Sequence, residues 1–174
     1  MRLRKLEEKD IPYMLEWMHD RSINCFFRFD AEAQTTESVR SFIQKANTNE
    51  NNEVHFAIAS DEDTYMGTVS LKNIDQEVHQ AEYAISVRKA FHGKSTASFA
   101  TQEILKYAFD ILGLNRVYLN VLPENIRAYK FYEKFGFVFE GEFFEAICIK
   151  GKIMNLKWYR LLKREYEALM EKSS

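Results

Sequence analysis

Cysteine, proline and glycine are scarce in this chain of 174 residues, which contains two, two and six of them respectively. The two cysteines, Cys25 and Cys148, lie far apart in the sequence, and the four histidines show no metal-ligand spacing. We therefore expect a core that needs neither a disulfide nor a metal, with Cys25 buried among its aromatic neighbours as a small hydrophobic residue. No stretch resembles a linker, so residues 1–174 are expected to form a single domain.

Long apolar runs and an excess of positive charge are also missing. No apolar run approaches the roughly 20 residues that span a bilayer, and residues 1–10 (MRLRKLEEKD) are too charged for a signal peptide. The net charge of −2 lacks the electrostatic signature of a nucleic-acid-binding protein. The sequence thus favours a cytoplasmic protein with neither a nucleic-acid nor a membrane partner.

The hydrophobic pattern indicates a sheet covered by helices. Apolar residues alternate in several segments, and after residue 95 the period changes from 2 to 3.6, which is typical of a helix. The predicted strands cover residues 1–6, 53–60, 65–74, 79–87, 115–122, 137–149 and 153–162. The predicted helices begin near Asp10 and Thr36 and cover residues 95–112 and 125–135, before a polar helix or tail from residue 163. This order predicts an α/β (α+β) fold, whose largely antiparallel central sheet has about six to seven strands and one parallel βαβ crossover and is flanked by helices.

The segment FHGKSTASFA (91–100) raises the question of a phosphate-binding loop. The P-loop pattern needs a glycine five residues before Gly93, where Arg88 stands, and no glycine spacing fits the dinucleotide pattern. What remains is a strand that ends near Val87 and a long helix that begins near Ser95. The unpaired N–H groups and the dipole of that helix end can bind a phosphate, although an ordinary capped helix would look the same at this point.

Two motifs together carry a resemblance to a known family. The first runs from His92 to Ala97 (HGKSTA), and the second, N-x-x-A-x-x-x-Y-E-K-x-G-F, is complete: Asn125, Ala128, Tyr132, Glu133, Lys134, Gly136 and Phe137. With both motifs in order, residues 54–160 resemble the GNAT superfamily of acetyl-CoA-dependent N-acetyltransferases, and within it the RimJ/RimL-like branch. The first motif usually reads R/Q-x-x-G-x-G/A, so His92 and Ser95 depart from it. Ser95 adds bulk and disfavours a left-handed backbone, which predicts a weaker or altered affinity for CoA.

The resemblance implies a GNAT fold and acetyl-CoA as cosubstrate, without a metal. It places the diphosphate at the helix N-terminus and the pantetheine arm along the strand that precedes it. The cofactor-binding residues expected on this basis are Ile85, Ser86, Val87, His92, Gly93, Lys94, Ser95, Thr96, Ala97, Ser98, Asn120, Asn125, Ala128, Tyr129 and Tyr132. Asn125 would equally serve as an ordinary N-cap of its helix.

Acetyl transfer to an amine needs a proton acceptor and a proton donor. A primary ammonium titrates near ~10.4, so a base is useful at neutral pH, and Glu82 is the candidate. It lies about 13 Å along an extended strand from Ser86, and related enzymes often carry a glutamate at the matching position. Tyr132 matches the family's general acid for the thiolate. A solvated carboxylate at 82 and a core aromatic at 132 are the alternative interpretations.

The acceptor pocket is expected between the connection after the first helix and the last hairpin. These segments supply aromatic residues and carboxylates that would suit a cationic amine, although they could equally be packing and a solvated rim. The candidates are Phe27, Phe29, Asp30, Glu82, Phe143 and Glu145.

The resemblance therefore predicts transfer of the acetyl group to a primary amine by direct attack through a tetrahedral intermediate. A protein N-terminus, an amino sugar, a polyamine, an amino acid and an antibiotic are all open as acceptors, and the oligomeric state is open too, with a homodimer as one option. The alternative function is a CoA-binding sensor or interaction module that kept the fold but lost catalysis, which the departures at His92 and Ser95 would favour.

Overall fold

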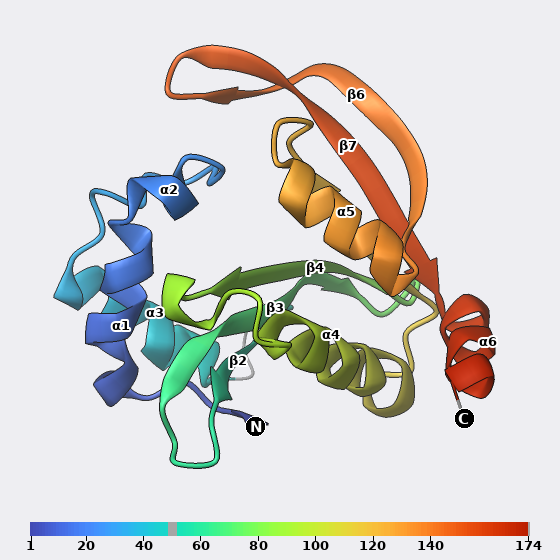
Figure 1. Ribbon diagram of the computed structural model, residues 1–174, viewed down its shortest axis with the longest axis horizontal. Coiled ribbons are helices and arrows are strands. Elements are labelled where there is room, and N and C mark those ends of the chain that lie inside the picture. The colour runs from blue at the N-terminus through green and yellow to red at the C-terminus, as the bar shows by residue number, and fades with distance from the viewer. Residues whose placement is uncertain (49–51, 174) are drawn as a thin grey trace.

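One seven-stranded sheet forms the centre of the computed structural model, which describes residues 1–48 and 52–173 (Figure 1). The strand order is β1-β2-β3-β4-β5-β7-β6, with β4 and β5 as the parallel pair and all other neighbours antiparallel. The strands are β1 (Arg2–Arg4), β2 (Val54–Ala59), β3 (Tyr65–Asp75), β4 (Gln80–Val87), β5 (Arg116–Val121), β6 (Val138–Ile149) and β7 (Lys152–Leu162). The predicted mixed sheet with one parallel crossover is confirmed.

Helices flank the sheet on both faces. Ala57 packs with α1 and α3, whereas the next residue, Ile58, packs with α4, because successive side chains of a strand point to opposite faces. The largest of the three hydrophobic clusters among the described residues lies on the α4 face and includes Leu105 and Leu119. The helices are α1 (Ile11–Met18), α2 (Arg21–Asn24), α3 (Thr36–Ala46), α4 (Thr96–Lys106), α5 (Ile126–Phe135) and α6 (Lys163–Ser173), and short 3-10 turns cover Glu8–Asp10 and Lys89–Phe91.

Two local expectations differ from the structure. The helix predicted over 95–112 is regular only to Lys106 and ends in a π-helical turn, Tyr107–Ile111. The prediction that Cys25 is buried was wrong, since both cysteines are exposed. After α2 the chain directs Phe26 and Phe27 inward, where they pack against hydrophobic clusters, and the small thiol lies outside them.

The parallel pair β4–β5 is short, and this creates a gap in the sheet. In the described chain its ladder ends at Glu82, which lies opposite Tyr118. Beyond that point β4 continues to Val87 beside β3, whereas β5 continues to Val121 beside β7. The two strands therefore diverge after Glu82, and the edge of β4 that faces away from β3 borders a gap rather than a strand.

The hairpin of β6 and β7 extends beyond the rest of the sheet and curves over α5 toward α2 (Figure 1). Near its tip Lys150 Nζ lies 3.5 Å from Glu32 Oε1, on the segment between α2 and α3. Phe26 of that segment also packs against the hydrophobic cluster that contains Ile149. The hairpin and the segment after α2, which are more than 100 residues apart, thus meet in space.

Candidate active site

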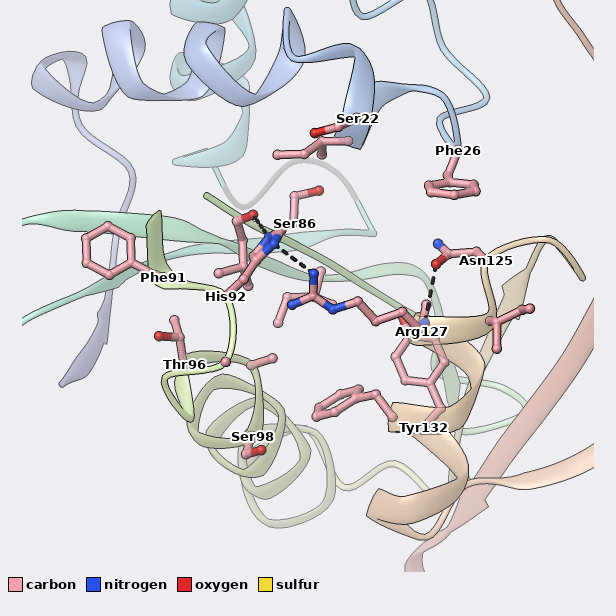
Figure 2. A pocket seen from close by; sticks show the side chains of 18 of the residues that line it. Ser22, Phe26, Ser86, Phe91, His92, Thr96, Ser98, Asn125, Arg127 and Tyr132 are labelled. Atoms are coloured by element: carbon pink, nitrogen blue, oxygen red, sulfur yellow. Dashed lines mark hydrogen bonds between the residues drawn. The ribbon is translucent and has the colours of Figure 1, made fainter. Parts of the chain in front are cut away.

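A cleft of about 630 Å³ adjoins the gap between β4 and β5 (Figure 2). The end of β4 and the start of α4 form one wall, the start of α5 forms another, and α2 with the segment after it adds a third. Most of the predicted cofactor-binding residues line this cleft: Ile85, Ser86, Val87, His92, Gly93, Ser95, Thr96, Ala97, Ser98, Asn125, Ala128 and Tyr132. Lys94, Asn120 and Tyr129 do not line it, although the sequence placed them in the same set.

The N-terminus of α4 opens into the cleft without a side-chain cap. Ser95 precedes the helix in the left-handed region, with φ of 60°, and its side chain makes no capping hydrogen bond. The chain therefore adopts the backbone that the family's glycine would favour, at a cost of about 1–2 kcal/mol for a residue with a Cβ. Thr96, the first helical residue, is almost fully buried and its Oγ1 has no partner in the described part of the chain. These are polar groups that a phosphate could satisfy.

Arg127 crosses the cleft from α5 to the loop before α4 (Figure 2). Its Nη1 donates to His92 Nδ1 over 2.9 Å, and His92 Nε2 in turn donates to the Val87 carbonyl over 2.8 Å. No carboxylate pairs with Arg127 among residues 1–48 and 52–173. A cation at this wall was not predicted from the sequence. Its position inside the second motif, two residues after Asn125, was the one available signal.

Tyr132 lies deeper in the cleft, on the same helix. Burial raises the pKa of its hydroxyl to about 12. The ring packs edge-on against Tyr83 and Phe137, with centroid distances of 5.9 Å to each. Asn125 caps α5 by accepting from the Ala128 N–H over 3.3 Å, as an ordinary N-cap would. The phenol is thus held by packing in its protonated form.

Glu82 lies at the apex of the gap, where three side chains donate to its carboxylate. Arg28 and Asn120 donate to Oε1, each over 3.1 Å, and Asn73 donates to Oε2 over 2.8 Å. The Glu82 side chain is only 10% exposed. A solvated strand carboxylate, the alternative interpretation of the sequence, is therefore wrong. Arg28 and Asn73 were missed because the contacts that bring them to Glu82 join segments with no shared sequence motif.

Comparisons with known proteins place this geometry in a family. Residues 1–138 match the family model described as an acetyltransferase (GNAT) domain. This chain belongs to the GNAT acetyltransferase family. It is 29% identical to the spermidine N(1)-acetyltransferase of Vibrio cholerae over 94% of each chain, and 36% identical to YdaF of Bacillus subtilis, a putative ribosomal N-acetyltransferase, over 58% of this chain and 55% of the relative.

A solved structure from the same family is similar throughout. The spermidine N-acetyltransferase of Vibrio cholerae, in complex with CoA and spermine, superposes with a TM-score of 0.86 at 28% identity and covers 95% of this chain and 97% of its own. The predicted enzyme class, an acyltransferase of the GNAT family, is confirmed. The RimJ/RimL-like branch stays a prediction.

Within this GNAT fold, the predicted acceptor residues fall into two groups. Phe27 lines the cleft and stacks on Phe29 at a centroid distance of 5.3 Å, while Asp30 accepts from the Ala33 N–H in a local turn. Phe143 and Glu145 lie instead on the β6–β7 hairpin and are exposed. The assignment of both groups to the acceptor site stays a prediction, as do the roles of the other site residues.

Two further properties of the described residues bear on the site. No group of three or more His, Cys, Asp and Glu side chains among them could hold a metal ion. In the same part of the chain, no helix has both the length and the apolar character that crossing a bilayer requires.

Proposed function

We propose that this enzyme transfers the acetyl group of acetyl-CoA to a primary amine of a polyamine. The observation that carries the proposal is the divergence of β4 and β5 after Glu82, together with the cleft that the end of β4 and the N-terminus of α4 line. A cosubstrate with a phosphorylated end and a long amide-containing arm matches this shape. Its phosphates meet the helix N-terminus, and its arm lies along the free edge of β4.

The chemistry divides between the two polar groups that flank the gap. Glu82 receives the proton of the acceptor ammonium, and the free amine attacks the thioester carbonyl to form a tetrahedral oxyanion, which a β4 N–H stabilises. Collapse of this intermediate breaks the C–S bond. Tyr132, which stays protonated because its pKa is raised to about 12, then donates its proton to the departing thiolate. The attacking nitrogen loses its excess proton, which leaves the neutral amide, and a proton returns to the Tyr132 phenolate.

A row of aromatic side chains beside Glu82 supports a polyamine as the acceptor. Tyr118 lies opposite Glu82 in the sheet, and Trp158 contacts both Tyr118 and Phe143 at centroid distances of 5.9 Å and 5.3 Å. Aromatic faces attract ammonium groups, so a chain with several ammonium groups can bind with one at Glu82 and others along the row. Relatives named as spermidine acetyltransferases, similar over nearly the whole chain, support the same class.

The test is acetylation of an amine panel with acetyl-CoA: spermidine, a peptide with a free N-terminus, an amino sugar, an amino acid and a simple monoamine. We expect spermidine to have the highest kcat/KM. Fastest turnover on the peptide would instead support the RimJ/RimL-like branch. Binding of CoA without transfer to any amine would support the sensor or interaction module.

The same assay with Tyr132→Phe tests the general acid. We expect kcat to fall at least about a hundredfold, because general acid catalysis typically contributes ~10²–10⁴. Tyr107→Phe is the matched control, since Tyr107 packs against Phe56 away from the cleft. Normal turnover by Tyr132→Phe would remove this residue from its proposed role.

A further inference from the structure

The carboxylate proposed to receive the acceptor's proton already has a cation of the protein beside it. The Arg28 guanidinium forms an ion pair with Glu82 Oε1 at 3.1 Å, and Asn120 and Asn73 complete the contacts of the two oxygens. An acceptor ammonium needs this carboxylate too. When the ammonium approaches, Glu82 Oε1 is already occupied, and the positive charge of Arg28 repels it.

Of the three donors, Arg28 is the one that carries a positive charge. Its side chain is 43% exposed, and Glu82 is its single acidic partner in the described chain. The residue before it, Phe27, packs against a hydrophobic cluster and meets Trp17 edge-on at 5.4 Å, whereas Phe29 after it is 47% exposed. Phe27 thus anchors one side of Arg28, while the long Arg28 side chain can rotate into solvent.

The low exposure of Glu82 explains why a cation stays beside it. A mostly buried carboxylate that loses its positive partner is strongly destabilised, so removal of Arg28 must be compensated by another cation. An alkylammonium carries the same charge and can donate to the same oxygen. Exchange of one cation for the other keeps Glu82 neutralised throughout.

We propose that Arg28 determines the affinity for the acceptor, by occupying Glu82 in the free enzyme and yielding that place to the acceptor's ammonium. Arg28 is a positioning and specificity-determining residue, because it touches neither cosubstrate nor reacting atoms once it is displaced. Amines that bind Glu82 weakly fail to displace it, whereas a polyamine with additional ammonium groups gains enough elsewhere to do so. The inference rests on the proposed function for the identity of the acceptor.

The experiment measures spermidine binding to wild type and Arg28→Gln by calorimetry, with CoA present at saturation and therefore without turnover. We expect the dissociation constant of the variant to be lower by roughly five- to twentyfold, because the competing ion pair is gone. Arg28→Lys should show a smaller decrease, and it also serves if the glutamine variant does not fold. An unchanged or higher dissociation constant in both variants contradicts the proposal, as does a lack of spermidine binding by all three proteins.

Two further variants show whether the effect acts through Glu82. Arg21→Gln removes the same charge from an exposed side chain of the neighbouring helix, which pairs with Glu32, and should leave spermidine binding unchanged. Combining Arg28→Gln with Glu82→Gln should abolish the gain in spermidine affinity. Equal tightening in Arg21→Gln would show a general charge effect and overturn the inference. Tighter binding by Arg28→Gln without acetyl transfer by any of the proteins would keep the role of Arg28 and remove the proposed function.

Discussion

The two ends of the gap between β4 and β5 differ in how their polar groups are satisfied. At the apex, the Glu82 carboxylate accepts from three side chains, one of them cationic. In the cleft, the buried hydroxyl of Thr96 has no partner within the described residues, and Arg127 reaches an imidazole nitrogen rather than a carboxylate. Buried polar groups without partners are rare in folded proteins. The cleft is therefore arranged to gain contacts from a ligand, whereas Glu82 at the apex must lose one of its present contacts before it can bind a ligand.

This contrast predicts opposite effects of mutation at the two ends. Substitutions in the cleft should weaken cosubstrate binding, while loss of Arg28 at the apex should strengthen acceptor binding.

The largest loss of CoA affinity is expected for Arg127→Ala. Since its guanidinium can leave His92 for a phosphate, the dissociation constant of CoA should rise about tenfold or more, as for other charge-assisted contacts. Pantetheine, which lacks the diphosphate, should bind wild type and variant equally when both are measured by calorimetry. Lys130→Ala, which removes an exposed cation from the same helix, is the control. An equal loss for pantetheine would show that Arg127 acts on the shape of the cleft instead.

A smaller loss of CoA affinity is expected for Thr96→Val. The valine replaces a buried hydroxyl that has no partner, so the free energy of unfolding should not fall, while CoA binding should weaken by about three- to tenfold. Thr101→Val gives the contrast, because Thr101 exchanges hydrogen bonds with Tyr83 and the Ala97 carbonyl. That variant should lose stability by about 1–3 kcal/mol in a urea titration. A similar loss in Thr96→Val would mean that its hydroxyl is satisfied in the free protein.

Ser95→Gly should change stability rather than chemistry. Glycine adopts the observed φ of 60° without the Cβ penalty, so we expect a gain of roughly 0.5–1 kcal/mol after its larger entropy in the unfolded chain is subtracted. Gly93→Ala, at φ of 75°, should lose about as much through strain alone, since a Cβ there meets no neighbouring atom. Urea unfolding of both variants checks the pair. A loss of stability in Ser95→Gly would show that the serine side chain has a structural role.

The smallest effect is expected for pH, since kcat should hardly change in the alkaline range. Because burial raises the pKa of Tyr132 to about 12, it should remain a proton donor, and kcat should not fall between pH 8 and pH 10 through loss of this proton. A tyrosine of ordinary pKa, near ~10, would be half ionised at the upper limit. The free energy of unfolding should depend on the same ionisation of Tyr132. The contribution from burying the neutral phenol is complete below pH ~10 and is lost as the pH rises toward 12. A kcat that halves by pH 10 in wild type but not in Tyr132→Phe would contradict this.

Much of the fold follows from the sequence because it depends on local pattern. Alternation marked β4, the turn at Gly151 marked the hairpin of β6 and β7, the change of period located α4, and Gly136 marked the end of α5. The end of α4 was not predicted, since a π-helical turn leaves the apolar spacing nearly unchanged over a single turn. The exposure of Cys25 was missed because aromatic neighbours do not specify which way an irregular segment turns.

The site was predictable where its residues lie within a motif or, as for Glu82, on the strand that precedes the first motif. His92 and Tyr132 were found by spacing, whereas Arg28 reaches Glu82 across 54 residues and Arg127 reaches His92 across 35. Such contacts depend on how separate elements pack, which no local pattern encodes. Lys94, although inside the first motif, does not line the cleft, and its Nζ lies 5.6 Å from the centroid of the Phe91 ring.

In the proposed mechanism, acetyl transfer takes place at the apex of the gap, beside Glu82. The most direct test is the acetylation of spermidine by Glu82→Gln, a nearly isosteric change that removes the proton acceptor, together with CoA binding to the same variant. We predict that kcat/KM falls about a hundredfold or more while the dissociation constant of CoA changes less than about twofold. A variant that acetylates spermidine as well as wild type would contradict the claim.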